Sequence, residues 1–520
     1  MGLIQVVRDE LPSYWNLTIL STLAIAIAGI YVSSLAVYRL YFSPIANIPG
    51  PKLAAVTQWF ETYYELVSGG GGNFTREIKK MHEKYGPIVR INPTEVHIDD
   101  VEYYETLYAP SMPYSKLQMF ENRFNMPRAT FATASHDLHK PRRAALAPFF
   151  STRRIQGHGR LMQELVDRIC GRLTEEYQGK GKALILNDVY GCLSGDVITN
   201  LAFARSYDLL STEHWESPFT IAVNNLIRDS HTMTHFSWII PFMNLFPDKL
   251  IMAISDNARP IVQFRQEMEQ QIRDILAGKN EDAKLASYDT VFAELLNSKL
   301  PPHELTQDRL QNEAVSVIGA GFETTRWALT VASYHILANP AITERLRQEL
   351  IEAIPDPDNI LSWADLQALP YLTACIEEAL RLSYGIVQRS PRVSPEIGFQ
   401  YKDIHIPPGF PVSMDNWHMH HNETVFPDSY TYKPERWLGN PKGPDGVKNL
   451  SRYMVAFGRG NRMCLGMPMA YCEIYIALAS LFRRFEFQLF ETGRDNVDFA
   501  QDYVTPQPKK GSLGVRVLVK

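Results

Sequence analysis

The sequence has few cysteines, and no two of them form a CxxC pair. Its 520 residues include five, an odd number without the paired spacing of a disulfide framework: Cys170, Cys192, Cys375, Cys464 and Cys472. This usage argues against a thioredoxin-like motif and against a zinc site made of cysteines. It predicts reduced, mostly buried thiols in a domain that faces the cytosol.

An excess of basic residues is also absent. Lys and Arg number 52 against 57 Asp and Glu, which gives a formal net charge of -5. Because nucleic-acid binding requires a basic surface, this balance argues against a nucleic-acid partner. The chain has no internal repeat and no linker between two cores, so residues 52–520 are expected to form one domain.

Charge is missing altogether from residues 17–37, in which Leu, Ile, Ala and Val dominate. At about 1.5 Å per residue, a helix of this length reaches roughly 30 Å, the thickness of a bilayer core. A cleaved signal peptide has a shorter apolar region of about 7–15 residues. We therefore predict a short N-terminal segment at 1–16, a transmembrane anchor at 17–37 and a stiff, proline-rich hinge at 38–51. Arg39 and Lys52 follow the span and favour a cytosolic body.

Helical patterns dominate the rest of the chain. They extend from about Leu161 to Leu382 and resume after Cys464. This distribution predicts a mainly α domain with minor β, not the strand–helix alternation of a doubly wound fold. The expected strands lie at residues 88–91, 96–98, 393, 399–406, 412–414 and 513–519.

A glycine-rich turn from Phe457 to Gly466 delivers Cys464 to the start of a helix expected at 465–484. Gly460 permits a turn that a side chain would obstruct, and Gly466 permits close approach of a flat ligand. Amide N–H groups of the turn and the positive end of the helix would stabilise a thiolate. Such a thiolate binds haem iron and favours O–O cleavage. A buried structural cysteine beside a glycine turn is the alternative.

These residues resemble the haem-binding motif of the cytochrome P450 superfamily, Phe-x-x-Gly-x-Arg-x-Cys-x-Gly, at every fixed position. The resemblance implies the cytochrome P450 fold, with haem b buried between a long central helix and the cysteine turn. It implies further that Cys464 is the axial ligand, that Arg462 pairs with a haem propionate, and that Phe457 and Gly466 contact the haem.

A second motif lies upstream of the cysteine turn. Glu378 and Arg381 share a helix face, which alone usually marks a solvated ion pair worth under about 1 kcal/mol. The pair resembles the Glu-x-x-Arg motif of the family. Its partner there is an arginine that corresponds to Arg436 in Pro434–Trp437, where Trp replaces the usual Phe. The resemblance implies a buried structural network that fixes the segment before Cys464.

The third motif lies in a long helix expected at about residues 304–337, whose centre is Gly319–Thr325. Two glycines in mid-helix cost about 1 kcal/mol each relative to alanine, so a reason for them is expected. A bond from the Thr324 hydroxyl to the Ala320 carbonyl would bend the helix and give dioxygen room beside the haem, which Ala320 borders. Glu323 and Thr324 resemble the acid–alcohol pair of the family, in which the alcohol orders water and the acid relays protons. A packing motif that happens to contain threonine is the alternative.

Three more positions follow from the resemblance. His139 and Arg143 are spaced like the Trp-x-x-x-Arg segment that contacts a haem propionate, with His in place of Trp. Arg392 stands where the family places another propionate-binding arginine. A solvated basic surface is the competing interpretation of all three.

The resemblance also implies an activity. The anchor and hinge resemble those of fungal microsomal members, and residues 382–389 resemble the trichodiene oxygenase-like branch of secondary metabolism. We expect a single-pass protein of the endoplasmic reticulum membrane with a cytosolic catalytic domain. This enzyme would insert one atom of O2 into an apolar terpenoid or polyketide, by hydroxylation or epoxidation.

Electrons are expected from NADPH through a separate cytochrome P450 reductase, with cytochrome b5 as a further partner. The chain itself has no flavin or nicotinamide fingerprint. The docking surface is expected on the Cys464 side, at Lys140, Arg142, Arg452 and Arg459. The alternatives are a haem-thiolate isomerase or dehydratase that needs no reductase, and a haem-binding protein without catalysis. Consumption of NADPH with substrate distinguishes the three.

Overall fold

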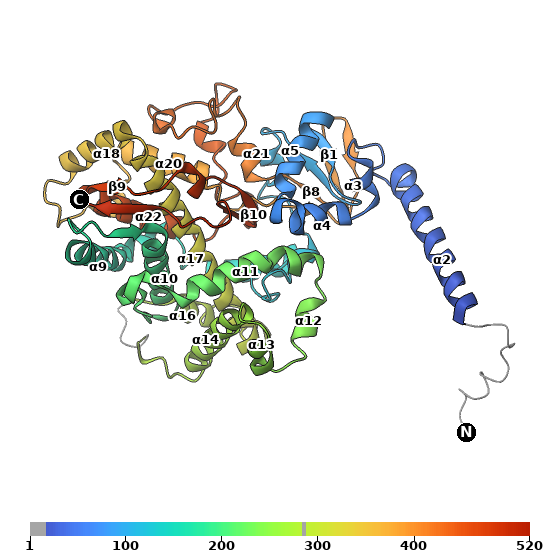
Figure 1. Ribbon diagram of the computed structural model, residues 1–520, viewed down its shortest axis with the longest axis horizontal. Coiled ribbons are helices and arrows are strands. Elements are labelled where there is room, and N and C mark those ends of the chain that lie inside the picture. Colours follow the sequence, from blue (N-terminus) through green and yellow to red (C-terminus); the bar gives the residue numbers. More distant parts are fainter. Residues whose placement is uncertain (1–16, 283–287) are drawn as a thin grey trace.

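The anchor forms one isolated helix. The computed structural model describes residues 17–282 and 288–520, so the segment expected at 1–16 lies outside the described residues. Helix α2 (Leu17–Val37) has the bounds expected for the anchor, and it extends away from the folded body (Figure 1). The stretch Ile19–Phe42 is 24 residues long, has a mean hydropathy of 2.0 over an 18-residue window, and is long and apolar enough to cross a membrane.

The segment after the anchor differs in part from the expected hinge. The π-helical turn η1 (Tyr38–Phe42) prolongs α2, because the first proline of the segment is Pro44. Ile45 and Ile48 are then buried against the first sheet and its neighbours. The segment was expected to be a stiff connection. In the structure it packs on the domain instead.

Helices form most of the body, as expected. The long ones are α5 (Phe74–Tyr85), α7 (His136–Leu146), α9 (Gly159–Glu176), α10 (Leu186–Phe203), α11 (Pro218–His235), α14 (Ala258–Leu276), α17 (Gln307–Leu337), α18 (Pro340–Ala353), α20 (Pro370–Ser383) and α22 (Met467–Arg484). Shorter ones are α3 (Lys52–Val56), α4 (Trp59–Leu66), α6 (Tyr104–Leu107), α8 (Thr152–Gly157), α12 (Ile239–Met243), α13 (Asp248–Ile254), α16 (Val291–Leu296), α19 (Trp363–Leu366) and α21 (Asn416–His420).

Helix α17 is the centre of the main core. It packs against α10, α14, α20 and α22, and it runs through the middle of the body in Figure 1. Pro340, at the first turn of α18, cannot continue the preceding helix and separates the two. Because α10 is buried on nearly all sides, the long helices enclose one continuous apolar core.

The strands form small sheets at the flanks. Strands β1 (Ile88–Arg90), β2 (Val96–Ile98), β8 (Val412–Ser413), β5 (Arg392–Val393) and β3 (Ser115–Lys116) make one sheet in that order. It lies with α3, α4 and α5 at the end of the body next to α2 (Figure 1). A second sheet has the order β4 (Ala183–Ile185), β12 (Arg516–Val519), β9 (Phe487–Leu489).

Two hairpins complete the strands. The strand-like stretch expected at 399–406 forms two strands, because β6 (Phe399–Tyr401) and β7 (Ile404–Ile406) pair with each other. Lys402 between them has a φ of 49°, which reverses the chain. The other hairpin, β10 (Gln501–Tyr503) and β11 (Thr505–Gln507), was not expected.

Candidate active site

The cysteine turn has the compact geometry expected of its glycines. Gly460 has a φ of +70°, and a Cβ on it would collide with the carbonyl oxygen of Tyr108, so only glycine fits there. The Cys464 amide donates to the Phe457 carbonyl at 2.8 Å, which closes the turn. Helix α22 then begins at Met467, two residues later than expected, with Gly466 as its N-cap.

The Cys464 thiol is accessible although protein surrounds it. Its side chain is exposed, yet burial raises the pKa of the thiol, while the amide N–H groups of Gly466 and Met467 and the charge of Arg143 lower it. The sulfur is therefore both accessible to a ligand and largely desolvated. A cation at the sulfur would complete the stabilisation of the thiolate that these groups begin.

Basic side chains gather near the thiol without anions to pair with. Within the described chain, none of Lys116, Arg143, Arg392 and Arg462 forms an ion pair with a carboxylate. Burial, followed by repulsion from Arg392 and Arg143, lowers the pKa of Arg462 to about 9. Burial also lowers the pKa of Lys116 well below its usual value, helped by Arg462. This accumulation of positive charge fits a ligand that carries carboxylates.

The residues that were expected to bind the haem propionates lie in this cluster. Arg462 donates to the carbonyl oxygens of Thr133 (2.7 Å) and Ala134 (2.8 Å), which orients its guanidinium. Burial, then Arg462 and Lys116, lower the pKa of His139 to about 2, so its ring is neutral. Sequence reasoning missed Lys116, although it is a basic residue on a short strand that pairs with Arg392.

Helix α17, in the middle of the body, has a short accessible face at Ala320 and Thr324, which we call the open face of α17. Between Arg309 and Ile336, all of which the structure describes, the exposed residues are Ala320 and Thr324. The Thr324 hydroxyl donates to the Ala320 carbonyl at 2.8 Å, as anticipated. Gly321 has a packing reason, because a Cβ there would lie 2.7 Å from Ile198 on α10.

Glu323 lies on another side of α17. Its carboxylate is buried and accepts two bonds from Arg326, from Nε at 2.8 Å and from Nη2 at 2.7 Å. The structure therefore brings Thr324 and Ala320 together but commits Glu323 to an ion pair. Arg326 was not predicted, although the i, i+3 spacing of the two charges was a signal.

The Glu378 carboxylate is the centre of a buried network. It accepts bonds from Arg381 (2.9 and 2.7 Å), from Arg436 Nε (2.9 Å) and from Trp437 Nε1 (2.9 Å). The tryptophan in place of the usual Phe thus adds a donor. Arg381 also donates to the Ser429 carbonyl at 2.6 Å, so the network holds the segment that leads to the cysteine turn.

One expected surface cation is misplaced. Arg142, expected on the docking surface, is buried and pairs with Glu304 through two bonds of 2.7 and 2.9 Å. Because helix α7 turns this residue inward, Arg142 is not available to an acidic partner. Lys140 on the same helix is exposed.

Comparison with known proteins decides the family. The model of the cytochrome P450 family matches residues 55–515. The chain belongs to the cytochrome P450 family. A cytochrome P450 monooxygenase of Eupenicillium brefeldianum, orf6, is 41% identical over 502 residues, 96% of this chain and 99% of the relative. The cytochrome P450 monooxygenase sdnE of Sordaria araneosa is 40% identical over 511 residues, 96% of this chain and 98% of the relative.

Another relative is named for its substrate. The tryptophan 6-hydroxylase fscE of Fusarium equiseti is 38% identical over 488 residues, 94% of each chain. This P450 is accordingly a monooxygenase, an oxidoreductase whose family binds haem through a cysteine thiolate. The residues around its thiol fit such a group, because an accessible, desolvated sulfur lies near basic side chains that form no ion pair with a carboxylate of the described residues. Its isolated apolar helix α2 is compatible with a membrane anchor.

Proposed function

We propose that this P450 binds haem b through Cys464 and oxidises an apolar substrate with O2. The observation that carries the proposal is the accessible, desolvated Cys464 thiol beside Arg143. The bound haem supplies the centre that activates dioxygen. The amides of Gly466 and Met467 hold the sulfur as thiolate, and Phe457 and Gly466 border the ring on this side.

The cation cluster has a matching role. Arg143, Arg392 and Arg462 pair with the two propionates, with neutral His139 beside them. Two carboxylates entering here would relieve the mutual repulsion that lowers the pKa of Arg462. Lys116, whose pKa is lowered by the same charges, gains an anion as well.

Thr324 and Glu323 serve proton delivery. The hydroxyl hydrogen of Thr324 is used in the bond to the Ala320 carbonyl, so its oxygen accepts a hydrogen bond from a water molecule. That water is held at the open face of α17, which Ala320 borders. Glu323 resupplies protons from the far side of the helix, and its ion pair with Arg326 orients the carboxylate.

The anchor indicates a membrane location, and the electron donor is expected in the same membrane. Helix α2 spans the endoplasmic reticulum membrane once and leaves the body in the cytosol. A surface with exposed apolar side chains on α12 and at both of its ends, at Trp238, Phe242 and Leu245, provides a second contact with lipid. NADPH–cytochrome P450 reductase, with cytochrome b5 as a further donor, supplies electrons on the Cys464 side, where Lys140 remains exposed.

The substrate is an apolar intermediate of fungal secondary metabolism, a terpenoid or polyketide, which is hydroxylated or epoxidised. The similarity to tryptophan 6-hydroxylase favours a second candidate, an aromatic amino acid or its derivative. Both classes place a C–H or C=C group at the open face of α17.

Reconstitution tests the proposal. The full-length protein with a reductase and NADPH should consume NADPH in response to ligands that shift the haem absorption spectrum. A library of terpenoids, polyketides and tryptophan derivatives identifies those ligands. Turnover of a ligand without NADPH would establish an isomerase or dehydratase instead, and binding without any turnover would establish a haem protein without catalysis.

A further inference from the structure

A second set of potential ligands lies where the first sheet meets α21. It consists of His82 on α5, His97 on β2, and Asp415 and His418 at the start of α21, and we call it the His97 cluster. The exposed fractions of these residues are 8%, 0%, 2% and 7%. None of the four takes part in the proposed oxidation.

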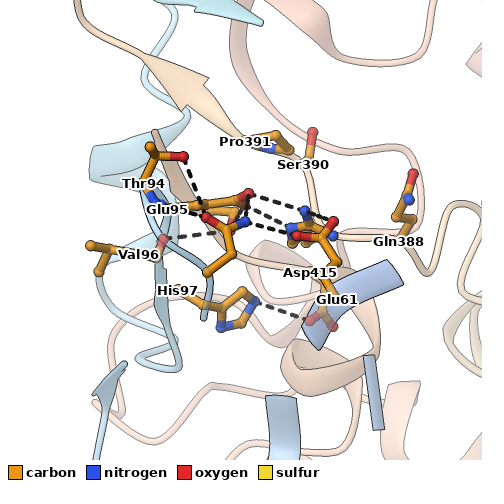
Figure 2. A network of polar contacts seen from close by, with 12 residues as sticks. Glu61, Thr94, Glu95, Val96, His97, Gln388, Ser390, Pro391 and Asp415 are labelled. Carbon is orange, nitrogen blue, oxygen red and sulfur yellow. Dashed lines mark hydrogen bonds and ion pairs between the residues drawn. The ribbon is translucent and has the colours of Figure 1, made fainter. Parts of the chain in front are cut away.

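The hydrogen bonds of the cluster fix where its protons are. His82 Nδ1 lies 2.8 Å from the Gly86 carbonyl oxygen, which only accepts, so Nδ1 carries hydrogen and Nε2 of a neutral ring accepts. His97 Nδ1 lies 2.8 Å from that Nε2 and must donate to it. A neutral His97 then presents a lone pair at Nε2 to the carboxylate of Asp415, 3.1 Å away (Figure 2).

Two acceptors that face each other need a positive species between them. A second proton on His97 or a metal ion satisfies this need. One oxygen of Asp415, Oδ2, lies 3.1 Å from His97 Nε2 and 2.7 Å from His418 Nδ1. One ligand atom from each of the three residues lies within 4.8 Å of the others. In a tetrahedral zinc site with bonds of about 2.0–2.2 Å, neighbouring ligand atoms are about 3.3 Å apart. The two contacts of Asp415 therefore need to lengthen by about half an ångström or less, and the two histidine nitrogens, which lie within 4.8 Å of each other, need to approach by at most about 1.5 Å.

His97 and Asp415 have the outer hydrogen bonds of metal ligands. Ligating histidines usually donate their other ring N–H to a fixed acceptor, as His97 does to His82. The second oxygen of Asp415 accepts the His418 backbone N–H at 2.8 Å, which orients the carboxylate. Nε2 of His418 is buried without a hydrogen-bond partner among the described residues. The hydrogen bonds of the described residues therefore leave one polar atom of the cluster without a partner.

A neighbouring cluster shows the contrasting case. Glu61, Glu65 and His235 also lie close enough to share an ion. The guanidinium of Arg389 already occupies that place, at 2.5 Å from Glu61 and 3.4 Å from Glu65. Asp415, in contrast, has no lysine or arginine partner in the described part of the chain. Of these two clusters, only the His97 cluster has no lysine or arginine in the place for a cation among the described residues.

We infer that His97, Asp415 and His418 bind a divalent transition-metal ion, zinc by its preference for imidazole and carboxylate ligands. The ion would be structural, because its ligands are buried. It would join the first sheet to α21, whose His420 accepts the Val455 amide at 2.8 Å and bonds to the Arg381 carbonyl at 2.8 Å. The site thus braces the network that holds the cysteine turn.

Metal analysis of the haem-loaded, full-length protein tests this inference. The protein is expressed with zinc supplied, purified without a histidine tag and passed over a chelating resin. Mass spectrometry of the elements should find about one zinc per haem iron. Asp415→Asn, which keeps the helix-capping oxygen, and His97→Gln should both lose the zinc. The control His405→Gln removes an exposed histidine of β7 and should retain it.

The wild type alone decides the matter if the variants do not fold. A strong zinc chelator should lower the temperature at which the haem spectrum is lost by several degrees, and Zn²⁺ should restore it while Mg²⁺ should not. Less than a tenth of a zinc per haem in the wild type would overturn the inference, and so would equal zinc in wild type, Asp415→Asn and His97→Gln.

Discussion

Replacing Thr324 by valine tests the role of the open face of α17. Valine keeps the β-branched shape and removes the hydroxyl that donates to Ala320 at 2.8 Å. A neutral hydrogen bond contributes about 0.5–1.5 kcal/mol. Because Thr324 is exposed, water can form a hydrogen bond with the Ala320 carbonyl that the variant frees. We therefore expect a loss of under about 1 kcal/mol of stability.

Thr330 provides a matched control in the same helix. Its hydroxyl donates to the Arg326 carbonyl, also at 2.8 Å, but the residue is fully buried. Thr330→Val leaves that carbonyl dry, so it should cost at least as much stability as Thr324→Val. Any effect of helix stability on the reaction would then appear more strongly in Thr330→Val.

The assay measures NADPH oxidation, product and hydrogen peroxide with a reductase and a ligand that shifts the haem spectrum. Thr324→Val should keep the ferrous–CO spectrum and the NADPH oxidation, while the ratio of peroxide to product rises several-fold. Thr330→Val should keep the wild-type ratio. Equal peroxide release from both variants, or none from Thr324→Val, would refute the role assigned to Thr324.

Three further perturbations address the rest of the structure. Trp437→Phe removes a 2.9 Å bond to the buried Glu378 carboxylate, so unfolding followed by loss of the haem spectrum should show a loss of about 1.5–3 kcal/mol; an unchanged transition would contradict that contact. Burial disfavours a charged His231, but Glu65 outweighs it and raises the pKa of His231 to about 9. The stability from this pair is complete below about pH 6.5 and is lost as pH rises through 9, so up to about 3 kcal/mol should disappear from the wild type in urea titrations but not from His231→Gln. Deletion of residues 1–44 should make the protein largely extractable from microsomes by carbonate, and full retention would contradict the anchor.

The sequence predicts best what depends on neighbouring residues. The bounds of α2 follow from one uncharged run, and the turn before Cys464 follows from glycines within a few positions. The bond from Thr324 to Ala320 and the pairing of Glu378 with Arg381 join residues three or four apart, which share a helix face.

Long-range partners were beyond the sequence. Arg389 meets Glu61 across more than three hundred residues, and no periodicity encodes that contact. Arg142 was expected at the surface on the basis of its charge. Charge alone does not tell on which side of α7 the residue lies, and the structure buries it. The ion pair of Glu323 with Arg326 was not predicted for another reason. Opposite charges three residues apart are common in helices, and the spacing does not reveal that the pair is buried.

The ferrous–CO absorption spectrum of Cys464→Ala, measured beside Cys472→Ala, tests the central claim most directly. Cys472 lies fully buried in α22, eight residues after Cys464, and removing its sulfur should leave the long-wavelength band of a thiolate-bound haem intact. Cys464→Ala should lose that band and all oxygenation. A long-wavelength band in Cys464→Ala, or its loss in Cys472→Ala with folded protein, would contradict the assignment of Cys464 as the ligand of the haem.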